Sequence, residues 1–572
     1  MPTSTKGLVQ DRAANTPISA ATAERRATLV RLAGHQKPIC PETKTRKAPR
    51  VTTPVNTSRL AVWLSDYDPQ LKDTLVKGFS EGFSIPSTLE SVPPSDYTNH
   101  RSALENPDIV SKKLNTELQL NRISGPFNHP PFHNFVSSPL GLVPKKSKGE
   151  FRLIHDLSFP KDSSVNSHIN PSFTAVHYQD LDHCVSIITS LGKNCLMAKA
   201  DLKDAFRIIP INSSDHRLLG FQWDGKFYHD RCLPMGCSVS CQLFETLSTA
   251  VQWILQTKLS VPFMSHILDD FIFFGPPSSK TCNTSLRTFF MLADSIKLPV
   301  KQSKTVFPTT CASLHGIEVD TEAMTMRLPL DKLLEARHKV NIMINRKKAP
   351  LVEFQSLIGT LNFACRVVVP GRAFLRRLID LTKGVSNQSH WIKLTASARL
   401  DLRAWSHFLS VFNGRVMCLP NSFETSDVLK LYSDASGAAY AAVLGKKWMQ
   451  GEFPQEWKTT NIAIKELLPI VLAVRLWGKD IANKRIMFFT DNLAIVSVIN
   501  NQTSKEPSLM SLVRTLVLAS LTNNILFLSK HIPGRHNVIA DHLSRSQVHK
   551  AHELAPWLEA HPTPFPLEWL PW

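Results

Sequence analysis

The sequence predicts an α+β fold followed by a separate α/β domain, and three observations predict it. Over residues 132–322, short apolar runs of β type alternate with helical stretches, a pattern typical of α+β folds. Residues 331–383 then read as helical and strongly basic. Residues 429–547 follow the order strand, strand, helix, strand, helix, helix, strand, loop, helix, which indicates an α/β domain of ordinary size.

The composition is that of a large globular protein. The 572 residues have room for roughly three or four folded units, and 43% hydrophobic with 20% charged residues excludes wholesale disorder. No apolar stretch approaches the roughly 18–20 residues of a membrane span, and a secretory signal is missing, so we expect an intracellular protein, cytoplasmic or nuclear, without membrane contact. The ten cysteines lack the spacing of a disulfide scaffold. The net charge of +19 favours a polyanionic partner, above all nucleic acid.

Both ends of the chain differ from its centre. Residues 1–62 contain no aromatic side chain and are rich in Thr, Ser, Ala, Pro and Arg, which predicts a disordered basic tail. Its basic cluster at residues 44–50 is either a nuclear import signal, a nucleic-acid contact or a solvated tail. Residues 548–572 are rich in Pro and Trp, and we expect no regular element there.

Several elements of the α+β region can be placed from their patterns. After Gly236, apolar residues recur at spacings of four, three and four, which places them on one face of a helix. These residues are Leu243, Leu247, Ala250 and Ile254. The β-type runs cover residues 140–144, 151–154, 195–202 and 271–274.

Two adjacent carboxylates lie within an apolar run. Asp269 and Asp270 stand side by side in "FMSHILDDFIFFG", where two ionised groups would repel one another and lose hydration. A hard divalent ion such as Mg²⁺ would offset that cost. The alternative is a surface hairpin whose Asp-Asp turn faces water.

A third acid strengthens the metal hypothesis. Asp201 directly follows the alternating apolar pattern of "CLMAKAD". Three acids at the ends of neighbouring strands would hold two metal ions about 4 Å apart, which is the arrangement for nucleotidyl transfer. Asp204, three residues further on, is interpreted as a solvated acid in a turn.

The surrounding motifs resemble those of reverse transcriptases. "AKADLKDAF", "CLPMGCSVSCQLFE", "ILDDF", "SKTVF" and "LHGIEVD" stand in the order and approximate spacing of that family's motifs A to E, and "SPLGLVPKKSKGEFRLIHDLS" is similar to its fingers motif. The resemblance implies a right-hand polymerase with fingers, palm and thumb. We accordingly expect a lead-in over residues 63–130, fingers and palm over 131–325, a helical thumb over 326–384 and a connection over 385–427.

The resemblance also implies roles for individual residues. Asp201, Asp269 and Asp270 would be the metal ligands, and Lys304 would be the general acid for pyrophosphate. Arg152 with Lys145 or Lys146 would clasp the incoming triphosphate, and the alternative for each of these basic residues is a surface charge.

Three further residues would contact the nucleotide. Phe206 corresponds to the bulky steric gate that excludes a ribose 2′-hydroxyl, with an ordinary core aromatic as the alternative. Gly236 begins the motif-B helix, where the absence of a Cβ lets backbone approach nucleotide or template; an ordinary helix-start glycine is the alternative. Two positions depart from the family: Met235 stands where relatives often carry Gln or Phe, and Ile267 replaces the usual Tyr. We expect these to alter fidelity or nucleotide selection.

A second set of acids lies downstream. Asp434, Glu466, Asp491 and Asp541 occur on strand, amphipathic helix, strand and final helix, an order that resembles the ribonuclease H family and implies a ribonuclease H-like domain over residues 428–547. In that resemblance the four acids bind two metal ions that activate water against an RNA phosphodiester. His531 precedes Asp541 by ten residues, the family's separation for its mobile histidine, with His536 as the alternative.

The phrases "SPLGLVPKK", "LIHDLS", "SLIGTLNFACRVVVPGRAFLRRL" and "ARLDLRAWSHFL" resemble DIRS-like retrotransposons, whose members are mobilised with a tyrosine recombinase. The resemblance implies an RNA-directed DNA polymerase with ribonuclease H activity that uses two Mg²⁺ or Mn²⁺ ions per active site. Its partners would be RNA template, DNA primer, RNA–DNA hybrid, deoxynucleoside triphosphates and an element-encoded recombinase. The alternatives are a domesticated or decayed copy that binds nucleic acid without catalysis, and a telomerase-like or viral RNA polymerase, which Phe206 and the second domain disfavour.

Overall fold

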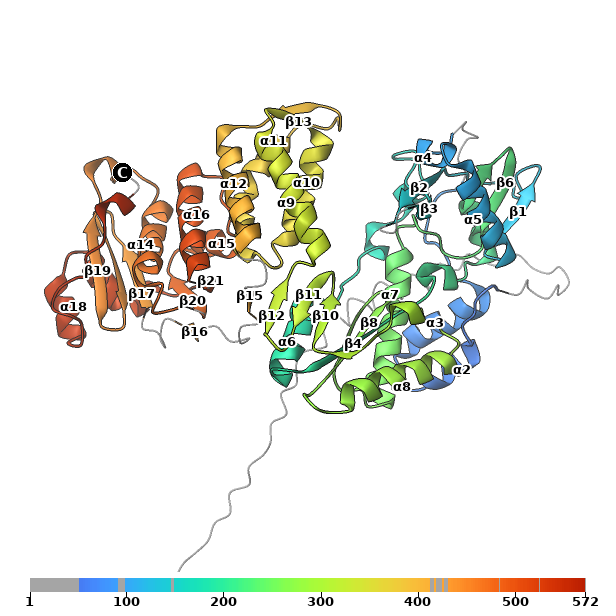
Figure 1. Ribbon diagram of the computed structural model, residues 1–572, viewed down its shortest axis with the longest axis horizontal. Helices are drawn as coiled ribbons and strands as arrows, with labels where there is room; N and C mark the ends of the chain where they lie inside the picture. The colour runs from blue at the N-terminus through green and yellow to red at the C-terminus, as the bar shows by residue number, and fades with distance from the viewer. Residues whose placement is uncertain are drawn as a thin grey trace, which may run out of the picture. The chain divides into compact units, whose positions relative to one another are not determined.

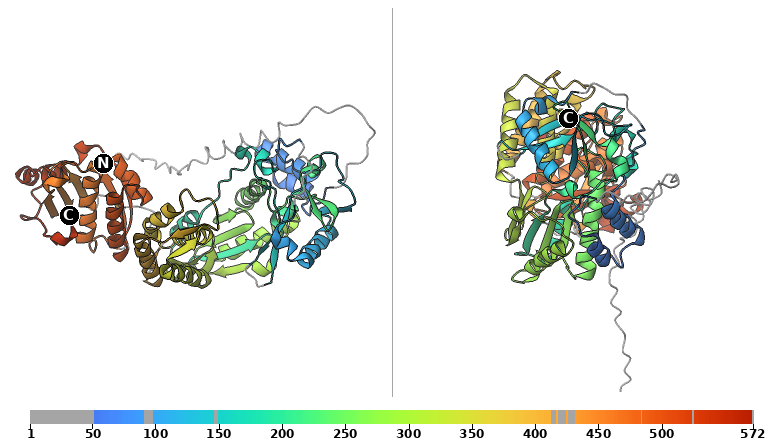
Figure 2. Two further views of the ribbon diagram at one scale, coloured as in Figure 1. Left: turned by 90° about the horizontal axis from the view of Figure 1, so that it is seen from above. Right: turned by 90° about the vertical axis from the view of Figure 1, so that its right-hand side faces the viewer.

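The computed structural model describes residues 51–90, 98–145, 149–411, 416–417, 424–425, 431–482, 484–523 and 525–570 (Figure 1). The chain divides into two compact units, which Figure 2 shows from two further sides. The first unit comprises Met1–His183, Met197–Gly275 and Ser279–Thr309, and the second comprises Cys184–Leu196, Pro276–Ser278 and Thr310–Trp572. No helix of the described residues combines the length and the hydropathy that crossing a membrane requires.

The first unit begins with a helix that the sequence did not predict. Helix α2 (Thr57–Trp63) is capped by the side chain of Asn56, which accepts a hydrogen bond from the Arg59 amide, and it buries Leu60. The predicted disorder of residues 1–62 is therefore wrong from residue 51 onward, because apolar residues near 60 find a core to pack against. Residues 1–50, with the basic cluster, lie outside the described residues. The following helices are α3 (Pro69–Glu81), α4 (Arg101–Leu104) and α5 (Pro107–Gln119), whereas α6 (Leu181–Leu191) belongs mostly to the second unit.

Two small antiparallel sheets share a core with α5. One has the order β1-β6-β5, and the other pairs β2 with β3. The predicted run at 140–144 coincides with β2, and the run at 151–154 is one residue shorter than β3. The strands are β1 (Ile123–Phe127), β2 (Leu140–Pro144), β3 (Phe151–His155), β5 (Gly220–Trp223) and β6 (Lys226–Asp230).

A four-stranded sheet of order β7-β8-β4-β9 carries the first group of acids. Phe271, Phe273 and Phe274 of β8 are fully buried and pack with α8, so the hairpin is anchored in the core. The predicted apolar helix face is buried along α7 and its continuation η5. The elements are β4 (Leu196–Asp201), α7 (Ser240–Trp253), the π-helix η5 (Ile254–Lys258), β7 (Met264–Ile267), β8 (Asp270–Gly275), α8 (Thr281–Ser295) and β9 (Val306–Thr309). Short 3₁₀ turns are η1 (Asn166–His168), η2 (Pro171–Phe173), η3 (Ala205–Ile208), η4 (Ser213–Leu218) and η6 (Gln302–Lys304).

The second unit contains a helical part that extends beyond the predicted thumb. Helix α12 packs against α9 and buries Trp405 and Phe408 completely, although the sequence placed it in a connection after residue 384. Asp401 of α12 lies 3.1 Å from Arg377 and 3.4 Å from Arg514, which joins α12 to α11 and α16. This part consists of β10 (Cys311–Leu314), β11 (Ile317–Asp320), β12 (Thr325–Arg327), α9 (Leu330–Asn345), β13 (Lys348–Pro350), α10 (Leu351–Ala364), η7 (Val369–Phe374), α11 (Arg376–Thr382), β14 (Trp391–Lys393), α12 (Ala396–Val411) and β15 (Val416–Met417).

The remainder of the second unit is an α/β arrangement. Antiparallel strands β17-β18-β19 form one sheet and parallel strands β16-β20-β21 another. Two features differ from the sequence prediction: β19 is an additional strand, and α14 is buried along almost its whole length, not amphipathic. The elements are β16 (Glu424–Thr425), β17 (Leu431–Ala435), β18 (Ala439–Leu444), β19 (Lys447–Glu452), η8 (Gln455–Trp457), α14 (Ile462–Trp477), β20 (Arg485–Thr490), α15 (Leu493–Asn501), α16 (Pro507–Thr522), β21 (Leu526–His531), η9 (Gly534–His536) and α17 (Val538–Ser544).

The Pro/Trp-rich tail contains a helix, contrary to the prediction. Helix α18 (Val548–Leu554) precedes the prolines of this segment, and η10 (Leu567–Trp569) directly follows Pro566. Ala551, Ala555 and Leu558 pack into a core cluster with Trp448. The Trp448 indole also donates a hydrogen bond to the Glu559 carbonyl at 2.7 Å. The domain therefore continues past residue 547, because small apolar residues at spacings of four and three find buried neighbours.

Candidate active sites

The first group of acids lies where β4 meets the β7–β8 hairpin. Asp201 is the last residue of β4, Asp269 lies in the hairpin turn, and Asp270 pairs with Ile267 to close that turn. The Leu202 amide donates a hydrogen bond of 2.9 Å to the Asp269 carbonyl, which ties the end of β4 to the turn. The topology therefore brings the three predicted ligands together at one end of the two central strands of the sheet, β4 and β8.

The electrostatics of these three clustered acids are unfavourable without a cation. Burial, followed by the charges of Asp201 and Asp270, raises the pKa of Asp269 to about 6. Asp201 is only 4% exposed, and Asp270 Oδ1 is buried without a hydrogen-bond partner. A buried oxygen without a partner is costly, and a hard cation is one partner that would satisfy it. These features fit a metal site better than a turn that faces water.

Two lysine ammonium groups neutralise part of the negative charge of these acids. Lys304 Nζ lies 2.7 Å from Asp201 Oδ2, and Lys199 Nζ lies 2.8 Å from Asp270 Oδ2. The sequence indicated Lys304 but missed Lys199, whose only signal is a charged residue inside the apolar strand before Asp201. Asp204 points elsewhere: it lies in a turn, as expected, but its carboxylate accepts a hydrogen bond of 2.9 Å from Arg122 and is ion-paired, not merely solvated.

The predicted nucleotide contacts lie on three segments. Arg152 is exposed on β3, and the Lys145 ammonium lies 3.3 Å from Glu150 at the end of the hairpin. Lys146 lies outside the described residues. Phe206 is half-buried in η3, its ring edge-on to Phe244 at 5.8 Å, so it is not an enclosed core residue.

Met235 and Gly236 form a loop before α7. Met235 is half-buried and Gly236 is exposed, and α7 begins four residues later, at Ser240. Gly236 therefore does not start the helix, because its φ of +132° is far from helical values. A Cβ at this position would lie 1.9 Å from the His155 carbonyl oxygen.

Replacing Gly236 by Ala should destabilise the protein by about 2 kcal/mol, since both the backbone conformation and the clash oppose a side chain. Urea unfolding of parent and variant measures the loss. Gly225→Ala is the matched control, because Gly225 has a φ of +67° with nothing within 4 Å of its Cβ position. An equal loss in both variants would contradict a close approach at Gly236.

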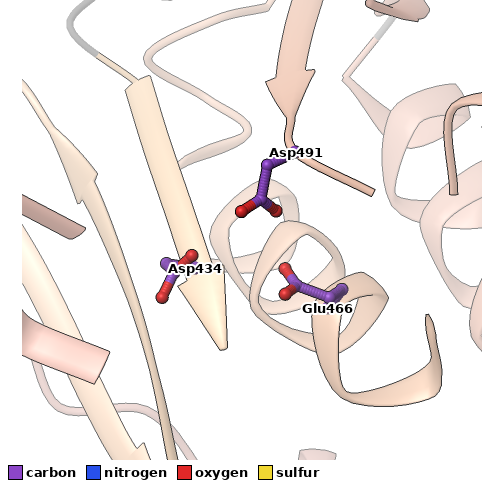
Figure 3. Close-up of side chains that lie close together, drawn as sticks. All are labelled: Asp434, Glu466 and Asp491. Carbon is purple, nitrogen blue, oxygen red and sulfur yellow. The ribbon is translucent and has the colours of Figure 1, made fainter. Parts of the chain in front are cut away.

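The second group of acids forms a compact cluster. Asp434 lies on β17, Glu466 on α14, and Asp491 immediately after β20, and Figure 3 shows their side chains converging from these elements. One ligand oxygen from each lies within 4.8 Å of the others. Among the described residues this is the one group of three or more potential ligands at such short mutual distances, so the acids around Asp269 are less tightly gathered. Three carboxylates are a donor set suited to Mg²⁺ or Mn²⁺.

Burial and mutual repulsion dominate the charge of this cluster. Burial, followed by the charges of Asp434 and Asp491, raises the pKa of Glu466 to about 9. Burial also raises the pKa of Asp434 to about 6. The Ser544 hydroxyl donates a hydrogen bond of 2.6 Å to Asp434 Oδ2, and the Asn537 amide lies 3.5 Å from Oδ1. Neither Ser544 nor Asn537 was predicted from the sequence.

The other two predicted members lie at the margin of the cluster. Asp541 is in the first turn of α17 and forms an ion pair of 2.8 Å with Arg545, although its charge still contributes to the raised pKa of Asp434. His531 is the exposed last residue of β21, and its Nε2 lies 3.1 Å from the Asp491 carbonyl oxygen. His536, the alternative, is exposed in η9.

Part of the chain is similar to a known protein family, and most of it is similar to individual known proteins at low identity. Residues 143–349 match the family model "Reverse transcriptase (RNA-dependent DNA polymerase)". The chain is 21% identical over 513 residues to the Transposon Tf2-3 and Tf2-7 polyproteins of Schizosaccharomyces pombe; the alignment covers 84% of this chain but 34% of each polyprotein. The chain therefore spans about a third of the length of these relatives.

Among solved structures, the chain is similar to a foamy viral protease-reverse transcriptase in complex with RNA/DNA hybrid, at 17% identity and a TM-score of 0.48, covering 86% of this chain and 64% of that one. For the same viral protein in complex with dsDNA, the identity is 18% and the TM-score is 0.46. That comparison covers 86% of this chain and 100% of the viral chain. The family match is confined to residues 143–349, which are similar to reverse transcriptase domains, and the similarity to retrotransposon polyproteins covers most of the chain at low identity.

Proposed function

We propose that this protein is an RNA-directed DNA polymerase that copies retrotransposon RNA into DNA. The observation that carries the proposal is that Asp201, Asp269 and Asp270 lie together at one end of strands β4 and β8, inside the region that matches the reverse transcriptase family. When bound there, two Mg²⁺ or Mn²⁺ ions would activate the primer 3′-hydroxyl and stabilise the leaving pyrophosphate.

The chain's own residues would do the rest of the work. Arg152, with Lys145 or Lys146, would hold the triphosphate by charge, and the half-buried Phe206 ring would exclude a ribose 2′-hydroxyl. Met235 and Gly236 would offer backbone close to the nucleotide. Lys304, whose ammonium lies beside Asp201, is placed to give a proton to the pyrophosphate oxygen.

Primer extension on an RNA template tests the proposal. We expect the parent protein to lengthen a DNA primer with deoxynucleotides and Mg²⁺ or Mn²⁺, and to stop when a chelator removes the metal. Ribonucleotides should support little extension because of Phe206. A folded parent that extends no primer with either metal would overturn the proposal.

We propose ribonuclease H as a second activity, on the strength of the Asp434, Glu466 and Asp491 cluster. These three acids would hold the metal pair, with Asp541 as a fourth ligand once it leaves Arg545. Bound ions would supply a water nucleophile and stabilise the leaving RNA oxygen. His531, exposed and next to Asp491, would assist departure of the product. The substrate would be the RNA strand of the hybrid that the polymerase makes.

Metal binding at this cluster should depend on pH. Folding raises the pKa of Glu466 from its ordinary 4.5 to about 9, so stability from this group is lost as the pH rises between these values. A divalent ion binds the deprotonated carboxylates and should offset the loss. The gain in Tm on adding Mg²⁺ should therefore be larger near about pH 8 than near about pH 5. Glu466→Gln should remove most of this difference, and an equal gain at both pH values in the parent would contradict it.

Finer assignments remain proposals of the same kind. We assign fingers and palm to residues 131–325, a thumb that begins at 326 and extends through α12, and a ribonuclease H-like domain that begins at 428 and includes α18. We further propose a DIRS-like element, in which a tyrosine recombinase gene would lie beside this reading frame, and a cytoplasmic or nuclear location. A neighbouring gene for an integrase of another class would contradict the DIRS-like assignment.

A further inference from the structure

Three segments proposed to face the incoming nucleotide converge on one buried ion network in the first unit. These segments are β3 with Arg152, η3 with Phe206, and the loop of Met235 and Gly236. At the centre of the network is Asp230, the last residue of β6, which is 4% exposed. No function proposed so far uses this carboxylate.

Asp230 holds the residue next to the proposed steric gate. Its Oδ1 accepts a hydrogen bond of 2.6 Å from Arg207 Nη1, and Arg207 directly follows Phe206 in η3. The same guanidinium also contacts Glu117 Oε2 of α5, through Nε at 2.9 Å and Nη2 at 2.8 Å. Because a guanidinium is planar and rigid, contacts with two carboxylates fix its orientation.

The other end of η3 is anchored as well. Asp204, which precedes the turn, accepts a hydrogen bond of 2.9 Å from Arg122. Arg122 in turn lies 3.8 Å from Glu117. Residues on both sides of Phe206 are therefore held by ion pairs: Asp204 pairs with Arg122, Arg207 pairs with Asp230, and both arginines contact Glu117.

The second oxygen of Asp230 reaches β3. Its Oδ2 lies 2.9 Å from His155 Nδ1, and His155 Nε2 lies 3.0 Å from the Gly220 carbonyl oxygen. Both partners are acceptors when Asp230 is ionised, so both bonds form only when both ring nitrogens carry hydrogen. His155 ends the strand that carries Arg152, and this contact fixes the strand end relative to η3.

His155 also contacts the loop before α7 through its backbone. Its amide donates a hydrogen bond of 3.1 Å to the Met235 carbonyl. Its own carbonyl oxygen occupies the space where a Cβ of Gly236 would lie. The third segment is thus packed against the residue that Asp230 holds.

We propose that Asp230 is a positioning residue that sets the Phe206 ring relative to β3 and the Gly236 loop, and thereby determines discrimination between deoxy- and ribonucleoside triphosphates. The inference rests on the proposed polymerase function. The Phe206 ring is half-buried and meets Phe244 edge-on at 5.8 Å, so it is less enclosed than a core aromatic and can shift if Arg207 moves. A displaced ring would leave room for a 2′-hydroxyl and would grip deoxyribose less well.

The test compares kcat/KM for dATP and ATP in primer extension on an RNA template, for the parent and for Asp230→Asn. The substitution keeps the shape of the side chain but removes its charge. We expect the ratio of dATP to ATP efficiency to fall about 10- to 100-fold, with a rise in KM for dATP and little change in primer-template affinity. A side chain with a purely structural role would change the amount of active protein but not this ratio.

Asp215→Asn is the matched control. Asp215 is another partly buried acid of the first unit, and its carboxylate accepts hydrogen bonds from the Ile85 amide at 2.9 Å and from the Ser214 hydroxyl, away from the hydrogen-bond partners of Arg207 and His155. We expect this variant to keep the parental ratio. If Asp215→Asn lowers the ratio as much as Asp230→Asn, the effect is general and the inference is overturned.

The remaining outcomes are also decisive. Should Asp230→Asn fail to fold by circular dichroism, Arg207→Lys replaces it, because lysine keeps the charge but lacks the planar, rigid donor geometry that orients η3 between Asp230 and Glu117; its ratio should also fall. An unchanged ratio of dATP to ATP efficiency in a folded, active variant overturns the inference about Asp230 but leaves the proposed polymerase function in place. A parent protein that extends no primer overturns the proposed function, and the inference with it.

Discussion

Replacing Asp269 by Asn should lower primer extension by roughly 1,000-fold or more, equivalent to about 4 kcal/mol of transition-state stabilisation. Asp269 lies in the turn that connects the two strands of the hairpin, and the burial and neighbouring acids that raise its pKa to about 6 make it a strong attractor of cations. An amide of the same shape can neither repel Asp201 nor neutralise a divalent ion. The fold should persist, because removing a charge from this cluster relieves repulsion.

Asp224→Asn is the control for this variant. Asp224 lies in the exposed turn between β5 and β6, with a φ of +49° that asparagine also tolerates. We expect it to extend primers like the parent. Extension by Asp269→Asn at the parental rate, with Mg²⁺ and with Mn²⁺, would remove the catalytic role from this carboxylate.

Replacing Asp434 by Asn should abolish cleavage of RNA in an RNA–DNA hybrid and leave primer extension largely in place. Asp434 lies within 4.8 Å of Glu466 and Asp491 through its ligand oxygens, and Ser544 directs its carboxylate. Loss of one of three clustered ligands should again cost about 4 kcal/mol of transition-state stabilisation. A labelled RNA strand annealed to DNA measures the cleavage.

Asp480→Asn serves as the matched control for cleavage. Asp480 belongs to the same domain, but its half-exposed carboxylate pairs with Lys447 at 3.0 Å on the surface. Surface ion pairs contribute little, so we expect parental cleavage. Hybrid cleavage that survives Asp434→Asn undiminished would show that this cluster does not carry the nuclease activity.

Local patterns predicted the elements that carry most of the acids. Alternating apolar residues before Asp201 specify β4, which ends in that carboxylate, and the apolar run after Asp270 specifies β8, which begins with that carboxylate. The helix face of Leu243 and Leu247 is buried as its spacing predicts. These features depend on neighbours within a few residues, so they can be read from sequence.

Contacts between distant segments were not predictable in this way. Nothing in the sequence relates Lys199 to Asp270 or Ser544 to Asp434, although each pair is joined by a short bond. The burial of α14 around Glu466 results from packing by α16 and by the β17-β18-β19 sheet, which a helical period alone does not reveal. For the same reason the sequence places α12 in a connection and α18 in a tail. Their apolar faces are stabilised by packing against distant segments, and the local sequence does not show which segments cover them.

One paired assay addresses the central claim that the chain holds two separate carboxylate sites for metal ions. Extension of a primer and cleavage of the template RNA would be followed in one reaction, on one labelled hybrid, for Asp269→Asn and for Asp434→Asn. We predict complementary losses: the first variant loses extension and keeps cleavage of a preformed hybrid, and the second loses cleavage and keeps extension. Parallel loss or parallel retention of the two activities in both variants would contradict two independent sites.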